Sequence, residues 1–186
     1  MRDQIDYKLS VEKDNLKIKT DYLRLFVDFI ANISLIGLPI FGVWIYVSRL
    51  FQTNTYYHHW TEIIISGLFC IGWFTYLVIW LTNVNKFYKV RGIDKKVNRQ
   101  IVAETLIEKK WHILHNNRDF IITFPEAGYF KTDQQVNILF SDNEILINVI
   151  TFSWRNLKSP FFPFKNKKTR QKLIKILEDK INKNTA

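Results

Sequence analysis

Six side chains suited to binding an anion stand near the end of the chain: Trp154, Arg155, Lys165, Lys167, Lys168 and Arg170. The stretch "KNKKTRQKLIKIL", residues 165–177, reads as an amphipathic helix with Asn166 as its N-cap, so the lysines fall at the helix start. Backbone N–H groups and lysines at a helix start bind phosphate, and the neighbouring aromatic and arginine side chains stack on bases. The pattern predicts a site for a nucleotide or an acidic lipid headgroup. The alternative is a solvated lysine face over packed aromatic residues.

No constellation typical of catalysis accompanies this basic segment. The six glycines form no phosphate-binding loop, and the single cysteine, Cys70, lies inside an apolar run. His112 and His115 lie three apart on a predicted strand, which puts them on opposite faces. Glu104 and Glu108 lie four residues apart on a predicted helix. They are either an acid–base pair or part of a solvent-exposed polar face, and the second interpretation is favoured. We therefore expect no enzyme activity, no metal and no cofactor.

Two apolar stretches, residues 25–47 and 63–81, are each long enough to cross a bilayer. The loop between them, residues 48–62, holds one arginine. Residues 85–186 hold 20 Lys/Arg and 10 Asp/Glu, which accounts for the whole net charge of +10. By the positive-inside rule, both termini are cytoplasmic. The abundance of Lys, Asn and Ile is typical of a low-GC bacterial genome, so the inner membrane is the expected location.

Three polar residues, Arg24, Asp28 and Asn32, recur at intervals of four on the first predicted span. In one interpretation Asp28 pairs with Arg24 and Asn32 bonds the neighbouring helix. In the other, the three form a polar seam that lines a pore or relay in a homo-oligomer. The sequence leaves both open.

The predicted organisation is a cytoplasmic segment (1–24), a transmembrane hairpin (25–84) and a basic cytoplasmic domain (85–186). In the domain, a strand in "KFYKVRGI" precedes a helix over residues 95–110 capped by Asp94, then two hairpins and the closing helix. Alternate residues of the second hairpin face one core, and the other face is mixed. This order predicts a two-helix transmembrane hairpin followed by a small α+β domain, an antiparallel sheet with two helices.

The closing segment resembles that of uncharacterised small bacterial two-pass membrane proteins, whose α+β domain ends in a "KNKK"-type basic segment and an amphipathic helix. Here "KNKK" stands intact at residues 165–168, with Phe164 in place of the preceding glycine and Thr169 in place of the following asparagine. The resemblance supports the domain and implies no catalytic residues.

Two functions remain open from the sequence. In the first, the cytoplasmic domain binds an anionic ligand, a nucleotide or lipid headgroup, and couples it to the membrane helices as a sensor or effector. In the second, the chain is a membrane immunity or accessory protein that binds another protein and no small ligand. Beyond the bilayer, a homo-oligomeric partner is expected, and specific DNA binding is not.

Overall fold

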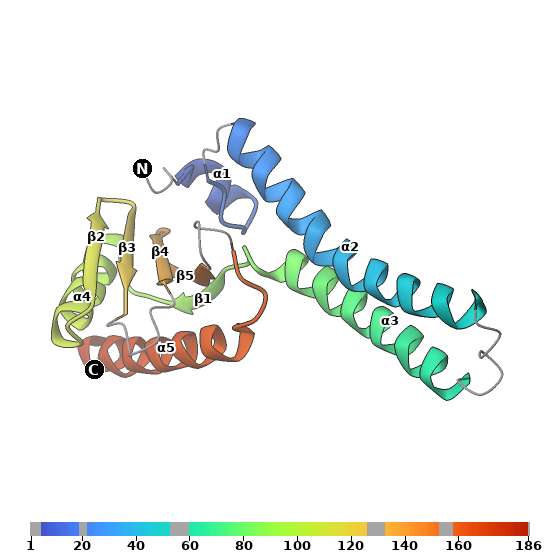
Figure 1. The fold of residues 1–186 in the computed structure, drawn as a ribbon. Helices are drawn as coiled ribbons and strands as arrows, with labels where there is room; N and C mark the ends of the chain where they lie inside the picture. The colour runs from blue at the N-terminus through green and yellow to red at the C-terminus, as the bar shows by residue number, and fades with distance from the viewer. Residues whose placement is uncertain (1–4, 19–21, 53–59, 126–132, 153–157, 186) are drawn as a thin grey trace. The chain divides into compact units, whose positions relative to one another are not determined.

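The computed structural model describes residues 5–18, 22–52, 60–125, 133–152 and 158–185, apart from some side chains of α2 and those of Asp133 and Thr185. Its elements are α1 (Tyr7–Glu12), α2 (Tyr22–Gln52), α3 (Trp60–Asn83), β1 (Tyr88–Arg91), α4 (Lys95–Glu108), β2 (His112–Asn116), β3 (Phe120–Phe124), β4 (Asp133–Phe140), β5 (Glu144–Phe152) and α5 (Pro163–Thr185) (Figure 1). The chain forms two compact units. One comprises residues 1–19 and 84–186, the other residues 20–83.

The first unit is built on a five-stranded antiparallel sheet in the order β1-β5-β4-β3-β2. The predicted order of strand, helix, four strands and helix is therefore confirmed, as is the α+β class. Side chains alternate between the two faces, so Val136, Ile138 and Phe140 share one core while Leu139 lies in another.

One face of the sheet is mainly apolar and lies under α4 and α5. Leu173, Leu177 and Ile181 of α5 are buried against it together with Val102 and Leu106 of α4. Their spacing of four residues keeps them on one side of each helix, as the sequence predicts for α5. These contacts hold the two helices on the sheet.

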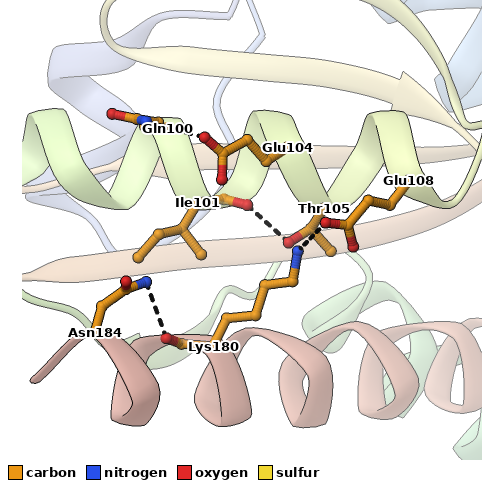
Figure 2. Close-up of polar contacts among 7 residues, drawn as sticks. All are labelled: Gln100, Ile101, Glu104, Thr105, Glu108, Lys180 and Asn184. Atoms are coloured by element: carbon orange, nitrogen blue, oxygen red, sulfur yellow. Dashed lines mark hydrogen bonds and ion pairs between the residues drawn. The ribbon is translucent and has the colours of Figure 1, made fainter. Parts of the chain in front are cut away.

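The two carboxylates of α4 have different partners, Glu108 on α5 and Glu104 on α4 itself. Figure 2 shows Lys180 reaching from α5 to Glu108, where its Nζ lies 2.7 Å from Oε1, and Gln100 donating to Glu104 at 2.9 Å. Both carboxylates therefore have structural partners within the helix pair. The pattern is that of a polar helix face.

The N-terminal segment packs against the opposite face of the sheet. The sequence did not predict this contact. Residues 5–18 close into a loop around α1: Asp6 caps that helix, and its backbone N donates to Lys17 O at 2.9 Å. Ile5 and Leu16 are buried with Leu139, Leu146 and other apolar side chains of this face. We call residues 5–18 the N-terminal loop.

A row of buried amides runs across the same face. Gln135 donates to Asn137 at 2.7 Å, and Asn137 donates to Asn148 at 3.4 Å. The Asn148 amide then donates to the backbone oxygens of Val84 and Lys86, at 3.0 and 3.1 Å. Residues 84–87, which follow α3 directly, are called the connector here.

The N-terminal loop and the connector also pair with each other. Leu16 N donates to Asn85 O at 2.8 Å, and Asn15 and Lys86 form an antiparallel bridge. In the sequence, the loop leads into α2 and the connector leaves α3. The segments that join the sheet to both long helices are therefore held together on one face of it.

The second unit consists of α2 and α3, which run antiparallel side by side (Figure 1). Tyr46 of α2 donates a hydrogen bond to Glu62 of α3. Among the described residues, one helix, α3, is long and apolar enough to cross a membrane, where the sequence predicted two such spans. α2 covers 31 residues and contains the first predicted span, with Pro39 inside it.

The prediction that His112 and His115 face opposite sides is wrong. Their partners on β3 are Phe124 and Ile122, which lie two residues apart and so on one face. An extra residue in β2, Leu114, shifts the register between them, and such a bulge puts two residues opposite one. Both histidines are exposed.

Candidate functional site

The basic segment predicted as a ligand site lies on α5, but the helix begins earlier than expected. Pro163 is the first helical residue, and Asn166 N already donates to Phe162 O at 3.0 Å. Proline suits the first position because its fixed φ is helical and its missing N–H has no partner there anyway. The predicted N-cap at Asn166 is therefore wrong. Of the four predicted cationic ligands on α5, only Lys165 lies in the first turn.

The four predicted α5 ligands do not converge on one point. At about 100° of rotation per residue, Lys165 and Lys168 share the exposed side with Lys172, whereas Arg170 points toward the sheet. Its guanidinium carbon lies 3.3 Å from the ring centroid of Tyr88, and burial lowers the pKa of this group from its ordinary value. Lys165, Lys168 and Lys172 therefore form an exposed row along one side of α5.

The remaining predicted residues fall outside what the structure describes. Trp154 and Arg155 lie in residues 153–157, which the structure does not describe. Arg24, Asp28 and Asn32 lie within the bounds of α2, but their side chains are among those not described. The polar seam on α2 stays a prediction.

An open cavity of about 380 Å³ lies instead at the start of α4. Its lining consists of Asp94, Lys95, Lys96, Arg99 and Arg118. Asp94 is the N-cap that the sequence predicted, and its carboxylate accepts from the backbone N of Lys96 at 2.9 Å. Four cations and one carboxylate give this cavity a positive field. We call it the α4 cavity.

Two of its cations are fixed by the protein. Lys95 Nζ donates to Asp119 at 2.6 Å and to the Tyr7 hydroxyl at 3.2 Å, while Arg99 donates twice to the Asn116 amide oxygen, at 3.0 and 3.2 Å. Burial alone lowers the pKa of Lys95, but the hydrogen bonds to Asp119 and Tyr7 raise it above the ordinary value. The Lys95 side chain is therefore protonated and is fixed in position by Asp119 and Tyr7.

The other two cations are available to a ligand. Lys96 and Arg118 are both exposed, and no described carboxylate pairs with either side chain. Arg99 also keeps donors beyond those that contact Asn116, since a guanidinium has five N–H groups. Planar guanidinium forks match phosphate oxygens well. The arrangement is suited to holding a phosphorylated group.

The sequence offered a partial signal for this cavity. It predicted a helix that starts after Asp94 and counted the surrounding lysines and arginines in the excess positive charge that follows the second predicted span. Arg118 comes from the turn between β2 and β3, and only the folded sheet brings that turn to the start of α4. Arg118 lies about 20 residues after Lys96 and Arg99, too far along the chain for a periodic sequence pattern to relate them.

Comparisons with family models, curated proteins and solved structures find no match for this chain. Among the residues that the structure describes, no group of three or more His, Cys, Asp or Glu side chains is placed to hold a metal ion.

Proposed function

We propose that this chain is a two-pass integral membrane protein whose basic α+β unit binds a phosphorylated ligand in the α4 cavity and passes the event to the membrane helices. The binding part rests on one observation: Lys96 and Arg118 line an open cavity without a described carboxylate partner, beside Arg99 and a helix start. Phosphate oxygens are the natural ligands of such a set.

The membrane part is supported by the surface of α3. Its 24 residues extend about 36 Å at about 1.5 Å per residue, enough for a hydrocarbon core of about 30 Å. Only 6% of its most apolar window is buried, and Ile65, Leu68 and Ile71 are each more than 60% exposed. Such an apolar surface is stable in lipid and costly in water. α2 forms the second helix of the proposed hairpin.

The proposed orientation places both termini in the cytoplasm of a bacterial cell. The α4 cavity then faces the compartment that holds soluble nucleotides, and Lys86, Lys89 and Arg91 follow α3 on the positive side. The polar seam of α2 provides a place for contact between copies in a homo-oligomer.

The proposed coupling runs through the N-terminal loop. Tyr7 contacts Lys95 beside the cavity and donates to Phe140 O at 2.5 Å. The same loop donates from Leu16 to Asn85 in the connector. An anion next to Lys95 competes with Asp119 and Tyr7 for its ammonium, so binding favours a different position of the loop. Allostery requires such differential contacts in two states.

A melting experiment tests ligand binding. The full-length protein, in nanodiscs of neutral lipid, is heated with and without pyrophosphate. We expect pyrophosphate to raise the melting temperature by mass action, with about 2.7 kcal/mol of stabilisation at a hundredfold excess over Kd. Lys96→Gln combined with Arg118→Gln should abolish the shift.

The matched control replaces two lysines of the sequence-predicted site, Lys167→Gln with Lys168→Gln. It should retain the full shift. Loss of the shift in this control, with retention in the cavity variant, would move the site to α5. No shift in the parent protein would contradict a phosphate ligand and favour a chain that binds another protein.

A further inference from the structure

The start of α5 combines exposed aromatic rings with lysines. Phe164 is 85% exposed and Phe161 is 62% exposed, although both belong to the unit that has the large buried core under α4 and α5. Lys165, Lys168 and Lys172 stand on the exposed side of the helix beside Phe164. No acidic residue occurs in α5 before Glu178. Aromatic rings next to lysines are typical of segments that lie in a membrane interface.

Contacts inside the first unit bring this segment close to the connector. Lys158 Nζ lies 2.6 Å from the Asn85 side-chain oxygen, and Arg170 stacks on Tyr88. Asn85 and Tyr88 follow the last residue of α3 by two and five positions. At no more than about 3.6 Å per residue, Tyr88 lies within about 18 Å of the end of that helix. The covalent connection therefore limits how far the start of α5 can lie from the bilayer into which α3 is proposed to insert.

We infer that the start of α5 docks on the surface of the bilayer, with Phe161 and Phe164 among the headgroups and Lys168 and Lys172 against phosphates of anionic lipids. This inference rests on the proposed membrane insertion and is separate from the α4 cavity. Gln134 and Thr151, whose side chains contact Asn166 at the start of α5, lie at one end of β4 and β5. The turn that carries Arg118 meets β4 at Phe140, about 20 Å away.

Docking also explains why the lysines and phenylalanines occur together. Each lysine near an anionic surface contributes about fivefold to the ratio of docked to undocked units, and the rings add apolar burial. A soluble phosphate uses the lysines only. The lipid surface uses both kinds of side chain.

The test uses the full chain in liposomes with a fluorophore on a single cysteine. Lys167→Cys, in a Cys70→Ser background, carries a polarity-sensitive label one turn from Phe164. Asn117→Cys carries it at the opposite end of the sheet. Lipids with a nitroxide on the headgroup are the quencher, and liposomes contain either phosphatidylglycerol or phosphatidylcholine alone.

We expect strong quenching at position 167 in phosphatidylglycerol, weak quenching in phosphatidylcholine, and weak quenching at position 117 in both. Replacing Lys168 and Lys172 by Gln should lower the docked-to-undocked ratio about thirtyfold. Phe161→Ser with Phe164→Ser should lower it while leaving the salt dependence of the remaining quenching intact.

Equal quenching at positions 167 and 117 in phosphatidylglycerol, in a protein that still floats with the liposomes, would overturn the docking and leave membrane insertion standing. A protein that does not float with liposomes would overturn the insertion itself, and the docking with it. The two failures are therefore distinguishable in one preparation.

Discussion

The face of the sheet under α4 and α5 carries Val136, Ile138 and Ile147, with the polar Gln134 and Thr151 at one end. The opposite face carries a continuous row of amides, Gln135, Asn137 and Asn148, among its apolar side chains. Apolar burial is strong but non-directional. Amide hydrogen bonds are directional instead, and the Asn148 amide donates to two backbone oxygens of the connector. The difference indicates that one face supplies stability while the other fixes how the sheet is joined to the long helices.

The largest expected effect comes from the apolar face. Leu177 is fully buried in the core between α5 and the sheet, so Leu177→Ala should lower the free energy of unfolding by about 2–5 kcal/mol. Ile107→Ala on the exposed side of α4 is the control, with an expected effect within about 0.5 kcal/mol. Denaturant unfolding measures both. Equal losses would mean that the apolar face is not the main source of stability.

A smaller loss is expected from the amide row. Asn148→Ala removes two donors and leaves the Val84 and Lys86 oxygens without this partner, which costs about 1–3 kcal/mol. Hydrogen exchange should also quicken in residues 84–87 more than in α5. Asn184→Ala, at an exposed position near the end of α5, should change neither quantity. Uniformly faster exchange across the sheet would contradict a local role for this amide.

Tyr7→Phe should cost less, about 1 kcal/mol, because it removes one hydroxyl that bonds Phe140 O and Lys95. The same change should raise the affinity for pyrophosphate, since Tyr7 then no longer competes with the anion for the Lys95 ammonium. Isothermal titration compares the two proteins. A large loss of affinity would make Tyr7 part of the binding site instead of the link beyond it.

The smallest effect is a pH dependence. Hydrogen bonds to Asp119 and Tyr7 raise the folded-state pKa of Lys95 above the ordinary 10.5. Its contribution to stability is therefore complete below pH 10.5 and is lost as the pH rises through the raised value. Lys95→Met should remove this alkaline step from the melting temperature. A step of the same size in the variant would assign it to another group.

Local patterns were enough to predict the elements of the α+β unit. Alternation in Ile145, Ile147 and Val149 identified the core face, and Asp94 marked the start of α4. The N-terminal loop was missed because its packing partners, such as Leu139 and Leu146, lie more than 100 residues away in the chain. The bulge in β2 was missed because one extra residue leaves no mark in composition.

The site was predicted less well than the fold. The cluster of lysines at residues 165–168 is dense in sequence, but helix geometry spreads it around α5 and packs Arg170 on Tyr88. The α4 cavity draws Arg118 from a turn whose position depends on the pairing of β2 with β3. Charge density along the chain therefore identified a basic unit and not the place where its cations converge.

Hydrogen–deuterium exchange of the full-length protein in nanodiscs, with and without pyrophosphate, tests the central claim most directly. Binding in the α4 cavity should protect residues 94–99 and 116–119. Coupling through the N-terminal loop should change exchange in residues 5–18 and 84–87, while residues 173–181 of α5 stay constant. Protection confined to residues 163–172, or protection of the cavity segments with no change in residues 84–87, would contradict the account.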